Sequence, residues 1–298
     1  MTINWKKIGL TAVSASALLL AACGTDSDSD TAASGEANGV SGEINLAYVA
    51  WDTEIASTNV IATVLEDYGY DTETTQLDNA IMWEAVASGD ADAMVAAWLP
   101  GTHAPQFEQY GDRMVHVSTN LEGAKIGLVV PEYMDVDSIA DLSDEAEQTI
   151  TGIEAGAGVV AASEQALEDY ENLADWNVQT SSSGAMTTQL KQAIKNEEEI
   201  VITGWSPHWM FQSYDLKYLE DAEGSFGDAE TIDTFAREGL EEDMPEAYQI
   251  LENFNWTTED MESVMLDIQE GTEPKEAART WVDANEDKVA EWTNGVGE

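Results

Sequence analysis

The most constraining feature of this sequence is an order of strands and helices that occurs twice. Short apolar runs typical of buried strands alternate with segments whose apolar residues recur every three or four positions, as in amphipathic helices. The first set ends at Trp98 and the second at Trp205, which lie 54 and 55 positions after Ile44 and Ile150, the first isoleucines of their sets. Alternating strands and helices favour parallel sheets with right-handed crossovers. We therefore expect an α/β protein with two lobes, each a mainly parallel sheet flanked by helices.

The same patterns place the individual elements. The first set is expected to contain strands at 44–51, 72–77 and 91–98 and helices at 54–68 and 80–88. The second is expected to contain strands at 149–154, 176–180 and 199–203 and helices at 161–173 and 185–195. A further apolar run covers 126–131, and 216–219 is expected to be a strand that returns to the first lobe. The remainder is expected to be helical, at 229–240, at 245–254, from a capping box at Thr257 onward, and from Pro274 to about Thr293.

The N-terminus resembles a bacterial secretory signal. A basic start and an apolar stretch from Ile8 to Leu20 lead into the letters LAAC, which resemble a lipobox ending at Cys23. The apolar stretch is too short to span a bilayer, and a single cysteine excludes an internal disulfide. We predict a signal peptide at 1–22, a lipid on Cys23 and a flexible tether at 23–42. The mature protein would be anchored on the extracellular face of the cell membrane, or on its periplasmic side where an outer membrane is present.

The charge of the chain excludes one large class of partners. The sequence carries 59 acidic residues against 11 Lys and Arg, a formal net charge of −48. Nucleic-acid binding requires basic surface, so we expect none. A content of 43% hydrophobic residues and 10 tryptophans indicates folded cores beneath an acidic surface. Self-repulsion of this size is screened at high salt, where the Debye length falls to roughly 3 Å. We therefore hypothesise a halophilic protein that works in brine.

No catalytic pattern stands out in the sequence. It lacks the G-x-S-x-G, H-E-x-x-H and phosphate-binding glycine signatures. Ser206 and His208 lie close together, but Ser206 followed by Pro207 is more simply a helix N-cap with proline at the first helical position. His103, His116 and His208 lack metal-ligand spacing. We expect no enzyme, no cofactor and no metal site.

Three tryptophans share one position in the predicted fold. Trp51, Trp98 and Trp205 each end a strand, and ligands of such sheets bind outside the carboxyl ends of the strands. Flat indole faces suit a quaternary ammonium, which has no N–H to donate and is attracted by the ring through cation–π interaction. If the ligand also has a carboxylate, His103 and the N–H groups of the 156–159 turn at a helix N-terminus could bind it.

The other tryptophans are expected to serve packing, with Trp209 left open between packing and ligand contact. They lie in or beside predicted helices, at Trp83, Trp176, Trp256, Trp281 and Trp292.

Long segments resemble the glycine betaine- and proline betaine-binding lipoproteins of ABC importers. They are AYVAWDTEIAST (47–58), AAWLPGTH (96–103), GLVVPEYM (127–134), GIEAGAG (152–158), ITGWSPHWMF (202–211) and LKYLED (216–221). The resemblance implies a two-lobe periplasmic-binding-protein fold of the second type, with the ligand in the cleft between the lobes. It further implies a cation box of Trp51, Trp98 and Trp205, and a carboxylate site made by His103 and the backbone N–H groups of Gly158 and Val159. The lobes would comprise 43–127 with 219–298, and 128–218.

The expected function is capture of glycine betaine, and of related betaines, for delivery to an ABC permease and its ATPase in osmoprotection. We expect a monomer that meets the membrane through the lipid on Cys23. Two alternatives stay open. One is the same fold with another solute, such as carnitine, choline, proline betaine or a sulfonium compound, although choline lacks the carboxylate that His103 and the glycine turn favour. The other is a sensory binding module with no role in transport.

Overall fold

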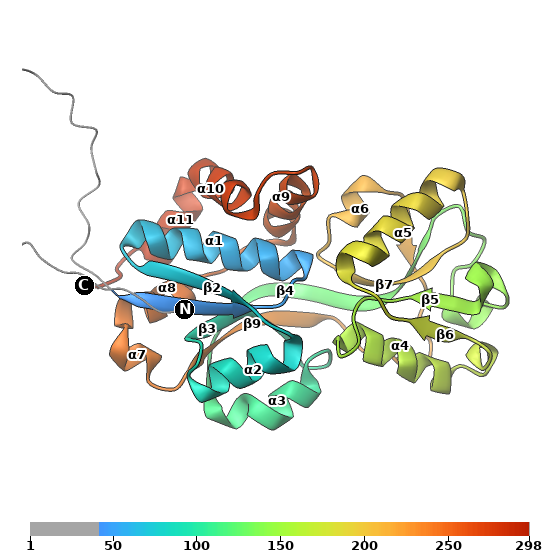
Figure 1. Ribbon diagram of the computed structural model, residues 1–298, viewed down its shortest axis with the longest axis horizontal. Coiled ribbons are helices and arrows are strands. Elements are labelled where there is room, and N and C mark those ends of the chain that lie inside the picture. The colour runs from blue at the N-terminus through green and yellow to red at the C-terminus, as the bar shows by residue number, and fades with distance from the viewer. Residues whose placement is uncertain (1–41, 298) are drawn as a thin grey trace, which may run out of the picture. The chain divides into compact units, whose positions relative to one another are not determined.

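One strand, β4 (Met114–Pro131), passes through both lobes of the fold. The computed structural model describes residues 42–297, all within one compact unit of the chain (Figure 1). The predicted signal peptide, the lipidated Cys23 and the tether as far as residue 41 lie outside the described residues.

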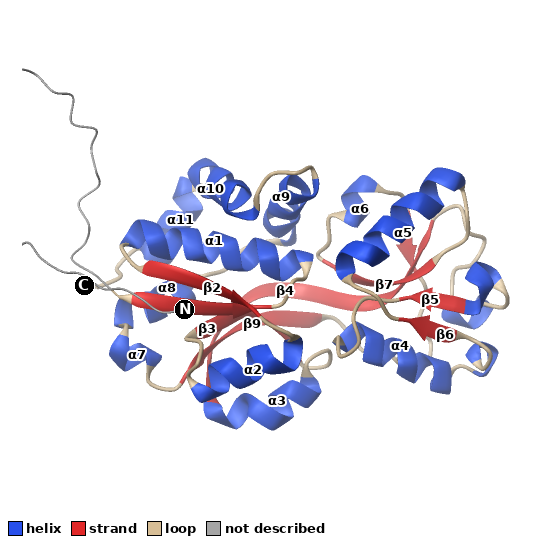
Figure 2. Ribbon diagram, viewed as in Figure 1, coloured by secondary structure: helices blue, strands red, loops and turns tan. Residues whose placement is uncertain are grey.

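The first lobe is built on the sheet order β2-β1-β3-β9-β4. Its strands are β1 (Glu43–Tyr48), β2 (Asp71–Gln76), β3 (Ala93–Leu99), β9 (Glu230–Arg237) and the first part of β4. Strand β1 runs parallel to β2 and β3, whereas β9 is antiparallel to both β3 and β4. All seven residues of β3 are buried except the last, because helices cover both faces of the sheet (Figure 2).

The second lobe repeats this design with shorter strands. Its strands are the second part of β4 with β5 (Thr149–Thr151), β6 (Asn177–Gln179), β7 (Val201–Ser206) and β8 (Leu216–Tyr218). Strand β5 is parallel to β6 and β7, and β4 is antiparallel to β7 and β8. Its helices are α4 (Gly158–Asp169), α5 (Ser183–Asn196) and α6 (Met210–Ser213).

Strand β4 exchanges partners where it leaves the first lobe. Residues from Met114 to Ala124 pair with β9, and residues from Lys125 to Val129 pair with β7. The β4–β9 ladder contains register shifts, which bend and twist a strand pair locally. A continuous strand therefore joins the two lobes directly beside the place where β3 and β7 end.

Helix α1 (Asp52–Tyr68) anchors the first lobe. Asp52 and Glu54 in its first turn complement the positive end of the helix dipole, and Gly69 ends it with a φ of 125°. Its buried face packs on the sheet and on helices from the C-terminal part of the chain. The remaining helices of this lobe are α2 (Asn79–Ser88), α3 (Ala104–Tyr110), α7 (Leu240–Asp243), α8 (Pro245–Asn253), α9 (Thr258–Gln269), α10 (Pro274–Ala284) and α11 (Glu286–Thr293). Within the described part of the chain, no helix has both the length and the apolar composition needed to cross a bilayer.

The predicted alternation of strands and helices is confirmed in both lobes, with boundaries displaced by a few residues. The capping box at Thr257 is also confirmed, because its hydroxyl accepts the N–H of Asp260 at 3.2 Å while its own N–H donates to that carboxylate at 2.9 Å.

The predicted helix at 229–240 is wrong, since these residues begin with strand β9. Thr231, Ile232, Thr234 and Phe235 are β-branched or aromatic, which favours a strand, and the slot between β3 and β4 buries this strand on both faces. The 216–219 segment is a strand as predicted, but it pairs with β4 in the second lobe rather than returning to the first.

Two smaller predictions are also corrected. Ser206 is not a helix N-cap, because it ends β7 and α6 begins only at Met210. Its hydroxyl lies 2.8 Å from the hydroxyl of Tyr218 instead. The predicted last helix is two helices, α10 and α11, which meet at Asn285.

Candidate ligand-binding site

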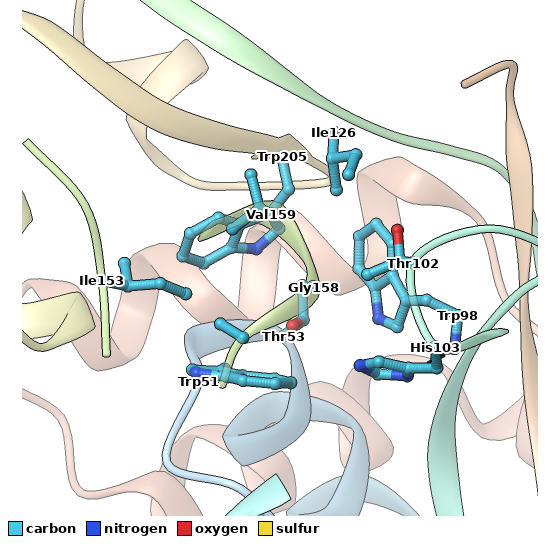
Figure 3. A pocket seen from close by; sticks show the side chains of 11 residues that line it. Trp51, Thr53, Trp98, Thr102, His103, Ile126, Ile153, Gly158, Val159 and Trp205 are labelled. Carbon is cyan, nitrogen blue, oxygen red and sulfur yellow. Dashed lines mark hydrogen bonds between the residues drawn. The ribbon is translucent and has the colours of Figure 1, made fainter. Parts of the chain in front are cut away.

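Three tryptophans from three different strand ends surround one cavity. Trp51 follows β1, Trp98 lies near the end of β3, and Trp205 lies near the end of β7. Each indole lines the same cavity, and each residue is at most 6% exposed. In Figure 3 the rings of Trp51 and Trp205 lie on opposite sides of the central space, with Trp98 between them on one side. Two of the rings come from the first lobe and one from the second.

The rest of the lining is apolar or neutral. It consists of Thr53, Thr102, His103, Ile126, Ile153, Ala157, Gly158 and Val159. None of the lining residues carries a formal charge at neutral pH, so the cavity would bind a charged group through ring faces and hydrogen-bond donors.

His103 contributes a hydrogen-bond donor to this cavity. The backbone N–H of Trp98 donates to its Nδ1 at 3.0 Å, so Nδ1 carries no proton and Nε2 does. Burial lowers the pKa of His103 to about 3, which keeps the ring neutral. Nε2 is buried and has no partner among the described residues. A buried donor without an acceptor is costly, and this one belongs to a residue that lines the cavity.

Aromatic rings hold the imidazole in place. Trp51 stacks beside it at 5.9 Å between ring centroids with an interplanar angle of 19°. Trp83 meets it edge-on at 5.8 Å. The His103 ring is therefore fixed on the Trp51 side of the cavity (Figure 3).

Two backbone donors face the cavity from the second lobe. Helix α4 begins at Gly158, so the N–H groups of Gly158 and Val159 belong to its first turn and have no acceptor within the helix. No other described hydrogen bond uses them. The positive end of the helix dipole adds to their attraction for an anion. Gly158 also lies against Thr102 of the first lobe, where a Cβ would come within 2.3 Å of the Thr102 carbonyl oxygen.

The loop that carries Thr102 and His103 is held by Glu230, which the sequence prediction missed. One oxygen of this buried carboxylate accepts the N–H groups of Gly101 and Thr102 at 2.6 and 2.7 Å, and the other accepts the Thr102 hydroxyl. Glu230 begins β9, a strand predicted to be a helix. In a chain with 59 acidic residues, nothing in the sequence distinguishes this one.

Two further side chains support the indoles from outside the cavity. Glu154 of the second lobe accepts the indole N–H of Trp51 in the first. His208 meets Trp205 edge-on at 4.6 Å with an interplanar angle of 83°. The sequence prediction left His208 out of the site, and His208 is not among the residues that line the cavity. Its position three residues after Trp205 was the only local signal of its supporting role.

Comparison with known proteins gives the family. Residues 42–284 match the family model OpuAC, described as the substrate binding domain of ABC-type glycine betaine transport system. The chain belongs to the OpuAC family. This family consists of substrate-binding proteins rather than enzymes, so the prediction of a non-enzymatic binding protein is confirmed, as is the predicted family. Its members act in the extracellular or periplasmic space.

Individual relatives agree with this assignment. The glycine betaine/carnitine transport binding protein GbuC of Listeria monocytogenes is 52% identical over 161 residues, 54% of this chain and 54% of that protein. The match thus spans about half the length of that curated relative. A crystal structure of lactococcal OpuAC, in a closed, liganded conformation with glycine betaine, is 54% identical with a TM-score of 0.83. That match covers 85% of this chain and 99% of the solved chain.

A more distant structure confirms the fold class. The glycine/betaine/L-proline-binding protein ProX of Borrelia burgdorferi is 32% identical with a TM-score of 0.82, covering 85% of this chain and 97% of the other. The two-lobe fold of type II periplasmic-binding proteins, predicted from the sequence, is therefore the fold of this OpuAC-family chain.

The other tryptophans that the structure describes in this OpuAC-family chain do not line the cavity. Trp209, which the sequence left open, is buried, and its indole N–H donates to Asp52 at 2.8 Å. Five more are buried, at Trp83, Trp176, Trp256, Trp281 and Trp292, and of these Trp83 packs behind the His103 ring.

Proposed function

We propose that this protein captures glycine betaine, and related betaines, between its lobes. The observation that carries the proposal is that three indole faces and an unpaired side-chain donor, Nε2 of His103, line the same cavity. The first feature suits a quaternary ammonium and the second suits a carboxylate. Membership of the OpuAC family supports the same ligand class.

The indoles would bind the cationic end of the ligand. A trimethylammonium group spreads its charge over methyl groups and cannot donate a hydrogen bond, so a carboxylate has little advantage over a ring face. Trp51, Trp98 and Trp205 offer both apolar area and cation–π attraction, about 0.5–2 kcal/mol for each contact according to its desolvation. Their near-complete burial places them at the favourable end of that range.

The donors would bind the anionic end. His103 Nε2 and the first-turn N–H groups of Gly158 and Val159 line the same cavity, and all three lack acceptors. Charge-assisted hydrogen bonds of this kind are roughly twice as strong as neutral ones. Choline has no carboxylate and would leave these donors unsatisfied, which favours a betaine over choline.

Because the site draws on both lobes, ligand would favour a closed arrangement. The expected lobes, 43–127 with 219–298 and 128–218, need adjusted borders. Residues 125–127 of β4 pair with β7, and residues 219–226 bond to the second lobe. The closed form would be what an ABC permease, driven by its ATPase, accepts from this protein. Import of a zwitterionic solute balances external osmotic pressure, which agrees with the acidic, salt-tolerant composition.

We propose further that a lipid on Cys23 tethers the mature chain to the outer face of the membrane. The LAAC segment supports this assignment. Labelling of cells with a fatty-acid analogue should mark the wild-type protein and not a Cys23→Ser variant. Equal labelling of both would remove the anchor from the proposal.

Calorimetric titration of the mature protein at high salt tests the function. Glycine betaine and proline betaine should bind more tightly than choline, and tetramethylammonium should bind weakly because it engages the indoles alone. Tighter binding of choline would overturn the carboxylate assignment, and failure of all these ligands would overturn the cation box. Uptake of labelled glycine betaine by cells with and without the gene separates transport from a purely sensory role.

A further inference from the structure

Asp52 joins the two lobes without lining the cavity. It begins α1 in the first lobe, directly after Trp51. Its Oδ2 accepts the hydroxyl of Ser183, and its Oδ1 accepts the indole N–H of Trp209, at 2.6 and 2.8 Å. Both donors belong to the second lobe and both are buried.

A third side chain of the second lobe faces the same carboxylate. Nε2 of His208 lies 3.7 Å from Oδ2 of Asp52. The N–H of Met210 donates to Nδ1 of His208 at 3.1 Å, so in the neutral ring Nε2 carries the proton and points its N–H toward Asp52. His208 also meets Trp205 edge-on. Asp52 thus lies between two tryptophans of the cation box. It directly follows Trp51 in the chain, and it faces His208, which packs against Trp205 in the other lobe.

The carboxylate is suited to remain ionised in this position. Burial alone would raise the pKa of Asp52, but the nearby His208 imidazole, together with the hydrogen bonds from Ser183 and Trp209, holds it well below its usual range. The N-terminus of α1 favours the same ionised form. Hydrogen bonds to an ionised acceptor are the strong ones.

These bonds exist only when the lobes meet. If the lobes separated, Asp52 would keep its place on α1 while Ser183 and Trp209 moved away with α5 and the segment after β7. We propose that Asp52 is a positioning residue that latches the lobes: its hydrogen bonds to Ser183 and Trp209 form on closure and set the affinity for any ligand that the cavity holds. This inference rests on the proposed ligand-induced closure, but it does not depend on which ligand binds.

If Asp52 latches the lobes, its replacement should weaken every ligand equally, whereas loss of a ligand contact should weaken only the ligands that make that contact. Asp52→Asn should weaken glycine betaine and tetramethylammonium by the same factor, about 10- to 100-fold, the range expected for loss of a hydrogen bond to a charged group. The loss should lie in a faster dissociation rate with an unchanged association rate, because the latch forms after the encounter. Ser183→Ala should give a smaller loss, and the double variant should lose less than the two single losses combined.

The matched control is Asp71→Asn, which makes the same chemical change at an exposed position on β2. It should leave both affinities unchanged. Circular dichroism and the ligand-free melting temperature establish that each variant folds. If Asp52→Asn does not fold, Ser183→Ala carries the test alone, with an equal loss for both ligands expected.

Three outcomes would overturn the latch: unchanged affinity in Asp52→Asn and Ser183→Ala, loss for one ligand only, or loss confined to the association rate. If wild-type protein binds no betaine, the proposed function fails separately. In that case the latch proposal is tested in ligand-free protein, by measuring the distribution of distances between spin labels placed on the two lobes. Asp52→Asn must lower the closed population there, and equal populations would overturn it.

Discussion

Trp98 and His103 are tied to each other by two hydrogen bonds. The N–H of Trp98 donates to Nδ1 of His103 at 3.0 Å, and the N–H of His103 donates to the carbonyl oxygen of Trp98 at 2.9 Å. The first bond fixes the tautomer, so the proton is on Nε2, at the cavity. One six-residue turn therefore presents both an indole face and an N–H donor to the cavity, at a fixed separation.

Replacing His103 should weaken binding of the ligand's carboxylate without weakening binding of its cationic end. His103→Phe keeps a ring beside Trp51 but removes the Nε2 donor. We expect glycine betaine to bind roughly 10- to 100-fold more weakly, the cost of a lost charge-assisted hydrogen bond. Tetramethylammonium, which has no carboxylate, should bind as it does to wild type. Calorimetry with both ligands measures this, and an equal loss for both would contradict the assigned role of His103.

Each box tryptophan should matter to the cation. Trp51→Ala, Trp98→Ala and Trp205→Ala each remove apolar area and a cation–π contact, so each should weaken glycine betaine and tetramethylammonium at least tenfold. Trp176→Ala is the control, because Trp176 is as buried but lies away from the cavity. It should lower the melting temperature without changing affinity. Near-normal affinity in all three box variants would contradict the cation-box model.

Much of the fold could be predicted because its signals are local. The periodicity of apolar residues identified most strands and helices up to Trp205, although it missed α3 and the first part of β4. The rule for open α/β sheets placed Trp51, Trp98 and Trp205 at one edge. Strand β9 could not be found in this way. Its residues Thr231–Phe235 include apolar side chains at spacings that also fit a helix, and only the slot between β3 and β4 decides the structure.

Contacts between distant segments explain what the sequence did not reveal of the site. Glu230 holds Thr102 from 128 positions away, and Asp52 meets Ser183 from 131 positions away. Such carboxylates look like any other acid on the chain until folding brings the distant segments together. His103, by contrast, was identified because it lies within the same turn as Trp98.

Gly158 should be intolerant of any side chain. In the structure a Cβ at this position would lie 2.3 Å from the carbonyl oxygen of Thr102, which belongs to the other lobe. Gly158→Ala should therefore prevent full closure and weaken all ligands by about tenfold or more, since backbone atoms cannot move aside. The ligand-free protein should melt as wild type does.

Gly184→Ala provides the matched control for this variant. A Cβ at Gly184, also in the first turn of a helix, meets no atom within 4 Å. Its affinity should equal that of wild type. Small-angle scattering should show that ligand compacts Gly184→Ala normally and Gly158→Ala less. Full compaction of Gly158→Ala would refute the steric explanation.

His103 should also leave a signature in the pH dependence of stability. Burial lowers its pKa to about 3 in the folded protein, whereas an unfolded histidine titrates near 6.5. Between these values the unfolded chain binds more protons than the folded one, so stability falls as pH falls from 6.5 toward 3. One histidine contributes at most about 1.4 kcal/mol for each pH unit. Above pH 6.5 its contribution is constant.

The difference between wild type and His103→Phe isolates this effect. Urea unfolding between pH 7 and 5 should show a steeper decline for wild type. The buried Glu54, whose pKa is raised by its burial, contributes with the opposite sign, but it is present in both proteins and cancels in the difference. Parallel profiles would mean that His103 is protonated as readily in the folded protein as in the unfolded chain.

Salt should stabilise the folded protein strongly. With a formal net charge of −48, repulsion among surface carboxylates opposes the compact state. Raising NaCl from 0.1 to 1 M shortens the Debye length from roughly 10 to roughly 3 Å, which screens most of that repulsion. The urea midpoint should therefore rise with salt.

A triple variant, Asp71→Asn with Glu73→Gln and Glu84→Gln, removes three exposed charges and should be more stable than wild type at low salt but similar at high salt. A midpoint that does not change with salt in wild type would argue against adaptation to brine, whatever ligand the cavity binds.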